Sequence, residues 1–355
     1  MQALDVCRNA ARFGFEMTLV SAGGGALEDE FRASGVEFIR LRRKLPVDPG
    51  LISSLRQIIR EKDIEIVHGY QPVDGLHLHF ATRKLPEVKT VLSFQGFIQD
   101  TKNRLASRFL IPRLDANIVV SHGLRHWMET ECALDTSKNF TVIYNGADPE
   151  RVKPTGKSVK AELGLAKDTP LIGMIGSFYK DPRKDQMTLC KALPGVFAEI
   201  ENAQCIFAGR IEPGAEDKYE QCVSFCREAG ITDRVHFLGM RSDVPDILAA
   251  LDLFVFSSLH EGLPVAVSEA MLAGVSMIVS DIEPLLEATN NGEFGEVFPV
   301  KNVEALAEKI LKLIKDEGLR NDLADRALKH AQENFSIDAH MRELKTLYDS
   351  LLSKT

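Results

Sequence analysis

The sequence has no long apolar stretch. Although 45% of its 355 residues are hydrophobic, no run approaches the roughly 18 consecutive apolar residues that a membrane-spanning helix requires. The first residues also lack the basic and apolar regions of a signal peptide. We therefore expect a globular protein that stays in the cytoplasm.

Cysteine is scarce and is not arranged for metal binding. The six cysteines include no Cys-x-x-Cys pair, and Cys222 and Cys226 have no His or further Cys close by in the sequence. This pattern favours free thiols over a zinc site or a disulfide framework. Two pairs of closely spaced histidines would need additional ligands, so we expect no metal site.

Positive charge is in deficit. The net charge of −8 argues against a general binder of nucleic acid, and the negative excess lies after residue 150. The first 150 residues carry two basic clusters that are candidate contacts to an anionic lipid or a membrane surface, although such residues as often solvate a protein face. The clusters are Arg40, Arg42, Arg43 and Lys44, and then Lys102, Arg104, Arg108 and Arg113.

Short apolar runs alternate with helical stretches in the first 150 residues. One such stretch, Leu51–Arg60, places its apolar residues on one face. The alternation predicts a parallel sheet with helices on both faces. The expected strands are Met17–Ser21, Val36–Leu41, Ile64–His68, Val88–Phe94, Asn117–Ser121 and Thr141–Tyr144.

The chain opens with a predicted helix, Gln2–Phe13. An α/β nucleotide-binding domain normally begins with a strand and a glycine-rich turn, so we expect that both are missing here. Gly23–Gly25 follow an expected strand but form no Gly-x-Gly-x-x-Gly pattern, and a simple turn explains them.

A second alternating array follows a polar stretch, and we place the boundary near residue 150. Its helices include Val303–Lys315 and a final amphipathic helix, Ile337–Leu352. The expected strands are Leu171–Ile175, Gln204–Ala208, Val235–Leu238, Leu253–Phe256 and Val275–Val279.

Two spaced acids mark the stretch from residue 257 to 281. Glu261 precedes a predicted helix, Val265–Ala273, with Pro264 at its first position, and Glu269 lies in the second turn. Both acids can face one ligand, and the free N–H groups and dipole of the helix start favour an anion or hydroxyl oxygens. Because the helix looks buried, an ionised Glu269 would cost several kcal/mol unless it were paired. The alternative interpretation is that Glu269 meets a structural Arg or Lys and that Glu261 only favours the helix start.

The Ser-Ser, Glu-Gly and Leu-Pro context of these acids resembles the Glu-x7-Glu motif of the retaining glycosyltransferases of family 4. Tyr144–Pro149 is similar to that family's Pro-Asn-Gly-Val-Asp passage. The resemblance implies an α/β protein with the GT-B fold, in which two Rossmann-like, doubly wound parallel-sheet domains face a central cleft. The implied parts are residues 1–149 as the acceptor-side domain, 150–335 as the nucleotide-sugar domain and 336–355 as a helix that crosses back.

By this resemblance, Glu261 binds the hydroxyls of the donor sugar and Glu269 holds the ribose of the nucleotide. Lys184 matches the family's diphosphate-binding Lys, but the partner Arg position is Ser177, and Arg183 is the candidate replacement unless it is simply a solvated loop residue. The implied donor-binding residues are Gly176, Ser177, Arg183, Lys184, Gly209, Arg210, Met240, Arg241, Glu261, Gly262, Leu263, Pro264 and Glu269.

The sequence departs from the family where a His commonly contacts the donor sugar, because that place reads Ser93-Phe94-Gln95-Gly96. Gln95 can hydrogen-bond a sugar hydroxyl but cannot carry a proton, and its alternative role is to hold a turn. His68, Gln95 and Gly96 are the acceptor-side candidates, with a structural role as the alternative for His68. The implied catalytic residues are Glu261, Lys184 and Gln95.

The expected activity is transfer of a sugar, with retention of anomeric configuration and without a metal, from a UDP-sugar or, less favoured, a GDP-sugar. The acceptor would be a saccharide or a lipid-linked hydroxyl, on the inner face of a membrane if lipid-linked. The nucleotide sugar is a co-substrate and no other cofactor is implied. The rival interpretations are a nucleotide-sugar epimerase of the same fold and a relic that binds nucleotide sugar without turnover.

Overall fold

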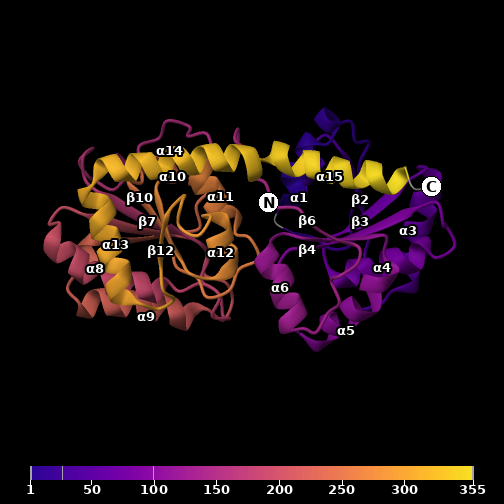
Figure 1. The fold of residues 1–355 in the computed structure, drawn as a ribbon, viewed down its shortest axis with the longest axis horizontal. Coiled ribbons are helices and arrows are strands. Elements are labelled where there is room, and N and C mark those ends of the chain that lie inside the picture. The colour runs from indigo at the N-terminus through magenta and orange to yellow at the C-terminus, as the bar shows by residue number, and fades with distance from the viewer. Residues whose placement is uncertain (1, 26, 99, 354–355) are drawn as a thin grey trace. The chain divides into compact units, whose positions relative to one another are not determined.

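The computed structural model describes residues 2–25, 27–98 and 100–353 and divides the chain into two compact units (Figure 1). Unit 1 comprises Met1–Gly146 and Ile337–Thr355, and unit 2 comprises Ala147–Ser336. The sequence predicts these divisions after residues 149 and 335. Unit 1 is therefore built from two separate segments of the chain.

Unit 2 contains one six-stranded parallel sheet with the order β12-β11-β10-β7-β8-β9. The chain order reverses between β7 and β10, as in a doubly wound Rossmann-like domain. All five predicted strands are present, and β12 was not predicted. The strands are β7 (Leu171–Ile175), β8 (Gln204–Ala208), β9 (Val235–Gly239), β10 (Leu253–Phe256), β11 (Met277–Ser280) and β12 (Glu296–Phe298).

Helices cover both faces of this sheet, since every residue of β10 and β11 is buried. Helix α8 packs against α9 and α13, whereas α11 packs against α14. The helices are α7 (Val159–Glu162), α8 (Gln186–Glu199), α9 (Glu216–Glu228), α10 (Val244–Ala250), α11 (Val265–Leu272), α12 (Glu283–Ala288), α13 (Val303–Lys315) and α14 (Glu317–Asn334).

Unit 1 contains two sheets, so the prediction of a single sheet was wrong. Strands β1 and β2 pair in parallel, and the other four form a parallel sheet with the order β3-β4-β5-β6. In the described part of the chain, no strand joins the two sheets. The strands are β1 (Thr18–Ser21), β2 (Glu37–Arg40), β3 (Ile66–Gly69), β4 (Lys89–Phe94), β5 (Ala116–Val119) and β6 (Phe140–Val142).

The final helix, α15 (Ile337–Leu352), packs in unit 1, where Met341 and Leu344 share a core with Val91 and Ile118. The predicted first helix is shorter than expected, because α1 ends at Asn9 and a 3-10 turn follows. The other helices are α1 (Gln2–Asn9), α2 (Glu28–Arg32), α3 (Pro49–Glu61), α4 (Pro72–Thr82), α5 (Thr101–Leu110) and α6 (His122–Thr130).

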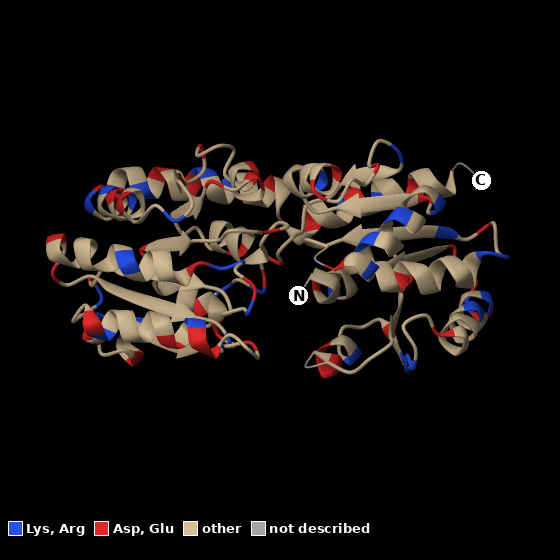
Figure 2. Ribbon diagram, turned by 90° about the horizontal axis from the view of Figure 1, so that it is seen from below, with Lys and Arg blue, Asp and Glu red and all other residues tan. Residues whose placement is uncertain are grey.

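Charged residues of both signs are interspersed along the helices of each unit (Figure 2). All six cysteines are free and buried, as the sequence pattern predicted for free thiols. Among the described residues, no helix is both long enough and apolar enough to cross a membrane.

Candidate functional site

The loops that follow β7 and β10 meet at the point where the strand order of unit 2 reverses. A backbone bridge joins Lys184 to Ser258. The N–H of Asp185 donates to the Ser257 carbonyl oxygen at 3.1 Å, and the N–H of Leu259 donates to the Arg183 carbonyl oxygen at 2.7 Å. Ligands of doubly wound sheets bind at this carboxyl edge, so these two loops form the candidate site.

A buried ion pair lies between the two loops. The Nζ of Lys184 contacts Oε1 of Glu261, and their side chains are only 10% and 12% exposed. The same Nζ lies 3.8 Å from the centroid of the Phe256 ring. Burial lowers the pKa of Lys184, and the Glu261 carboxylate partly offsets this effect. Removing either partner would leave the other charge buried and uncompensated.

Serine hydroxyls hold the loop that carries Glu261. The Ser258 Oγ lies 2.7 Å from Oε1 of Glu261 and 2.5 Å from the Arg183 carbonyl oxygen, and its single hydrogen can serve only one of them. Ser280, at the end of β11, accepts from the Ser258 N–H at 2.9 Å and donates to the Ser258 carbonyl oxygen at 2.7 Å. The loop conformation is thereby fixed by a neighbouring strand.

Glu269 is buried in α11 and pairs with Arg151, whose Nη1 lies 2.5 Å from its Oε1. The expectation that this acid needs a partner is confirmed, and the partner is an Arg, as the alternative interpretation held. Pro264 occupies the N-cap rather than the first helical position, because α11 begins at Val265. No side chain caps this helix start.

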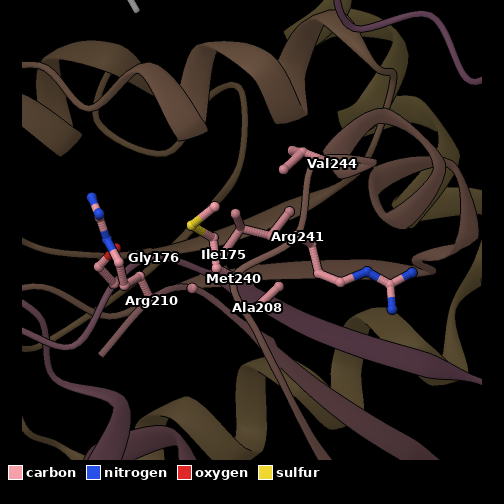
Figure 3. Close-up of a pocket in the computed structure, with 9 residues that line it drawn as sticks. Ile175, Gly176, Ala208, Arg210, Met240, Arg241 and Val244 are labelled. Carbon is pink, nitrogen blue, oxygen red and sulfur yellow. The ribbon is translucent and has the colours of Figure 1, made fainter. Parts of the chain in front are cut away.

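A cavity of about 190 Å³ opens beside these loops, at the ends of β7, β8 and β9 (Figure 3). Figure 3 shows the guanidinium groups of Arg210 and Arg241 pointing in opposite directions. The lining residues are Ile175, Gly176, Ser177, Ala208, Gly209, Arg210, Met240, Arg241 and Val244. Most of this surface is backbone and apolar side chain.

Gly209 allows two of the lining segments to approach closely. A Cβ at this position would lie 2.3 Å from the Gly176 carbonyl oxygen, and the neighbour is backbone that cannot turn aside. The N–H of Gly209 donates to the Gly239 carbonyl oxygen at 2.8 Å. The floor of the cavity therefore requires glycine at position 209.

The three predicted arginines of the donor site are each bound to acids of their own. Arg183 pairs with Asp181 at 2.8 Å, and Arg210 pairs with Glu212 at 3.0 Å. Arg241 contacts both Glu162, at 2.6 Å, and Asp243, at 2.7 Å. Arg183, the candidate replacement for the Arg that is missing at position 177, is thus held by Asp181. The carbonyl oxygen of Ser177 itself accepts a hydrogen bond from the Gln186 side chain.

The three acceptor-side candidates lie in unit 1 at the ends of β3 and β4. Both ring nitrogens of His68 are engaged, Nδ1 with the Tyr348 hydroxyl at 2.6 Å and Nε2 with Ser93 Oγ at 2.7 Å. Both polar atoms of the His68 ring therefore have partners within unit 1, as the alternative interpretation of a structural role requires. Gln95 and Gly96 follow β4 and are half-buried.

Sequence reasoning missed the residues that hold the two acids. Arg151 lies 118 residues before Glu269, and no local pattern joins them. Ser258 was part of the recognised Ser-Ser context, but its bond to Glu261 was not foreseen. The closest signal in the sequence was the predicted burial of Glu269. It indicated that a cation pairs with this acid but did not identify Arg151.

Two family models match the chain. "Glycosyl transferases group 1" matches residues 157–330, and "Glycosyltransferase Family 4" matches residues 1–151. Together they take in most of the sequence. Each match lies almost entirely within one of the two parts predicted from the sequence.

Two proteins of similar sequence bear the names of enzymes that act on glycosyl groups. The N-acetyl-alpha-D-glucosaminyl L-malate synthase of Bacillus anthracis is 26% identical over 86% of this chain and 80% of its own length. The UDP-Gal:alpha-D-GlcNAc-diphosphoundecaprenol alpha-1,3-galactosyltransferase of Escherichia coli is 24% identical over 96% of this chain and 90% of its own length.

Solved structures share the fold. The Anabaena protein Alr3699/HepE, crystallised with UDP and glucose, aligns with a TM-score of 0.82 and 19% identity, over 98% of this chain and 95% of its own. The two parallel-sheet α/β units, the Glu261–Glu269 spacing and the two family matches agree with one another. The chain is a member of the group 1, family 4 glycosyltransferases and has the GT-B fold.

Proposed function

We propose that this glycosyltransferase moves a sugar from a nucleotide diphosphate donor, UDP in preference to GDP, to a saccharide or lipid-linked hydroxyl with retention and without a metal. The observation that carries the proposal is the buried pair of Lys184 and Glu261 at the strand-order reversal of unit 2. Two similarities support the choice of uridine: the name of the Escherichia coli enzyme includes UDP-Gal, and the Anabaena protein was crystallised with UDP.

Lys184 would bind the diphosphate of the donor. An ammonium group is a good point-charge partner for phosphate oxygens, and the uncapped start of α11 offers further N–H donors. When Lys184 turns toward the diphosphate, the oxygens of Glu261 become available to the sugar hydroxyls. Each such charge-assisted bond contributes roughly 1.5 to 3 kcal/mol. The ion pair is then the donor-free arrangement of the site.

Glu269 would hold the ribose while it remains paired with Arg151. A carboxylate has about four lone-pair positions, so it can accept from Arg151 and from a ribose hydroxyl together. The cation would keep Glu269 ionised and oriented within α11. In this proposal Arg151 positions the acid and does not itself touch the sugar.

The cavity at the ends of β7, β8 and β9 would receive the nucleotide base. Its volume of about 190 Å³ is below the roughly 300 to 1,000 Å³ of whole-ligand sites, so it suits only part of a donor. Gly176 and Gly209 bring the backbone to the cavity lining, and Met240 is exposed beside them. Backbone bonds and apolar contact would then select the base, whereas Arg210 and Arg241 hold the loops.

Retention would follow from attack by the acceptor hydroxyl on the face from which the diphosphate departs. The C–O bond to the leaving oxygen breaks, the new C–O bond forms, and a diphosphate oxygen takes the hydroxyl proton. Lys184 and the start of α11 would stabilise the charge that develops on the diphosphate. Gln95 and Gly96 of unit 1 are the proposed acceptor-side contacts.

Location and acceptor are proposed together. The E. coli galactosyltransferase is named for a diphosphoundecaprenol acceptor, which supports a lipid-linked acceptor for this chain. We infer that the enzyme works in the cytoplasm, at the inner face of the membrane that carries such an acceptor.

The test is mass spectrometry of donor and product over a panel of UDP- and GDP-sugars, with and without saccharide and lipid-diphosphate acceptors. A glycosylated acceptor with retained configuration in the presence of a chelator supports the proposal. An epimerised nucleotide sugar formed without acceptor would establish the epimerase instead. Donor binding without any product across the panel would establish a protein that binds nucleotide sugars without turnover.

Lys184→Ala tests the proposed contact with the diphosphate. Lys180→Ala is its control, because it removes another Lys from the same loop. We expect Lys184→Ala to weaken UDP binding more than UMP binding, because only UDP has the second phosphate. Equal losses for the two nucleotides would exclude Lys184 from the diphosphate site.

A further inference from the structure

The loop between β7 and α8 is anchored near both of its ends. Near its start, the N–H of Phe178 donates to the Arg210 carbonyl oxygen at 2.9 Å, and the Phe178 carbonyl oxygen accepts from the N–H of Glu212 at 3.0 Å. Near its end, the Arg183 carbonyl oxygen accepts from the N–H of Leu259 at 2.7 Å. Because the backbone is held on both sides, a ligand would rearrange the side chains of the middle of this loop before its backbone.

An ion pair lies in the middle of this loop. The guanidinium of Arg183 contacts Asp181 through two nitrogens, Nε to Oδ1 and Nη2 to Oδ2, both at 2.8 Å. The N–H of Arg183 donates to the same Oδ1 at 3.1 Å. The Cζ of Arg183 lies 4.5 Å from the centroid of the Tyr179 ring, and the Nζ of Lys218 donates to the Asp181 carbonyl oxygen at 2.8 Å. The bonds to Asp181 raise the pKa of Arg183.

This ion pair is accessible to a ligand. The side chains of Arg183 and Asp181 are 38% and 29% exposed, whereas those of Lys184 and Glu261 are almost fully buried. Because a partly exposed ion pair contributes little to stability, the charges can exchange partners at a small cost. The next acid along the chain, Asp185, is engaged elsewhere, since its carboxylate caps α8. The contact with Asp181 is therefore the one that a bound anion would have to replace.

Arg183 precedes the Lys that the proposed function assigns to the diphosphate. The charge of Glu261, the partner of Lys184, also acts on Arg183, so the guanidinium is within electrostatic reach of the donor site. The position at which the family has its second cation holds the neutral Ser177. A diphosphate carries more negative charge and more acceptor oxygens than a carboxylate, and a guanidinium binds either of them in a bidentate manner.

We propose that Asp181 sets the affinity of the donor site, because it holds Arg183 while the site is empty and releases it to the diphosphate of a bound donor. The exchange replaces one charge-assisted contact with another and needs only rotation of the Arg183 side chain. Asp181 is then a positioning residue that does not itself touch the donor. After transfer its carboxylate competes again for Arg183, which favours release of the nucleotide diphosphate. The inference rests on the proposed function for the position of the diphosphate.

The experiment is titration calorimetry of UDP with the unchanged chain, Asp181→Asn, Arg183→Gln and the double variant. We expect Asp181→Asn to tighten UDP binding about fivefold, because Arg183 no longer has to leave a carboxylate. Arg183→Gln should weaken UDP binding about tenfold, and adding Asp181→Asn to it should bring no gain. Uridine, which has no phosphate, should bind all four proteins alike.

Glu199→Gln is the charge-matched control, because it removes an acid from an exposed pair with Lys315 elsewhere in unit 2. It should leave UDP binding unchanged. Weaker UDP binding by Asp181→Asn would overturn the proposal, because the pair would then only brace the loop. A gain that persists in the Arg183→Gln background would also overturn it, since Asp181 would then act by repelling the phosphates directly.

The same proteins separate this inference from the proposed function. Sugar transfer by the unchanged chain, without a gain in UDP affinity for Asp181→Asn, would overturn only the role of Asp181. A gain in UDP affinity without transfer across the donor and acceptor panel would overturn only the transferase. No binding of UDP by either protein would overturn both.

Discussion

Each of the two motif acids has its own cation in this structure. Glu261 contacts Lys184, and Glu269 contacts Arg151. A bound donor would break one of these ion pairs and leave the other in place. In the proposed function a diphosphate competes with Glu261 for Lys184, whereas Glu269 keeps its pair with Arg151 when the ribose binds. Substitutions at the two acids should therefore have different signatures.

We expect Glu269→Ala to weaken UDP binding roughly ten- to hundredfold, since it removes one or two charge-assisted bonds. Glu261→Ala should spare UDP and weaken the whole UDP-sugar. Titration calorimetry with UDP and with the UDP-sugar checks both. Arg151→Gln should also weaken UDP binding, because it removes the cation that keeps Glu269 ionised and oriented. Equal effects of the two Glu variants on UDP would contradict this division of roles.

The buried His68 predicts how stability depends on pH. Burial holds its pKa at about 3, against an ordinary value of 6.5, and the charge of His340 adds to the effect. The unfolded chain therefore binds a proton below pH 6.5 that the folded chain refuses, so stability is lost as pH falls. From pH 7.5 to 5 this residue alone should cost roughly 2 kcal/mol.

Urea unfolding at a series of pH values measures this loss. His68→Gln keeps hydrogen-bonding capacity toward Tyr348 and Ser93 without titrating, so its free energy of unfolding should fall less steeply over the same range. An identical slope in the variant would mean that other histidines, such as His330 with its lowered pKa, carry the dependence.

At the scale of elements, the position of each loop at the site depends on how closely the neighbouring strand ends approach each other. The end of β8 approaches the end of β7 so closely that Gly209 touches the Gly176 backbone. The loops after β7 and β10 are then joined by the Lys184–Ser258 bridge. The site is thus positioned by backbone contacts between strand ends together with the hydroxyls of Ser258 and Ser280.

Gly209→Ala should destabilise the protein by about 1 to 3 kcal/mol, because the new Cβ would overlap backbone atoms. Gly195→Ala is the matched control. It lies inside α8, and a Cβ added there would have no neighbour within 4 Å, so it should be neutral or stabilise by up to about 1 kcal/mol. Urea midpoints compare the two, and equal effects would contradict the close approach.

The elements of unit 2 could be predicted because buried parallel strands read as continuous apolar runs. Leu253–Phe256 and Val303–Lys315 have the predicted bounds. Strand β12 has three residues and begins with Glu296, which pairs with lysines, so it gives no such signal. Contacts across long sequence distances, such as His68 with Tyr348 280 residues later, leave no local pattern at all.

At the scale of the whole molecule, unit 1 depends on both ends of the chain. Its core combines Val6 near the start with Met341 and Leu344 of α15. Unit 2 is built from one continuous segment, Ala147–Ser336. Each unit has its own sheet system, so damage to one core need not destroy the other.

Truncation after Ser336 should unfold unit 1 and leave unit 2 folded, because it removes one wall of the unit 1 core. The single tryptophan, Trp127, lies in α6 of unit 1 and reports on that unit alone. We expect its emission to shift to that of a solvated indole, while circular dichroism retains a cooperative thermal transition. A native emission spectrum in the truncated chain would show that α15 is dispensable for unit 1.

The return of α15 to unit 1 also sets an order of events during synthesis. About 190 residues are translated between the two segments of unit 1, which at roughly 5 to 20 residues per second takes on the order of ten seconds or more. Throughout that time the nascent chain would present an incomplete apolar core while unit 2 is already able to close. We therefore expect chaperones to bind the first segment of unit 1 until α15 has been synthesised.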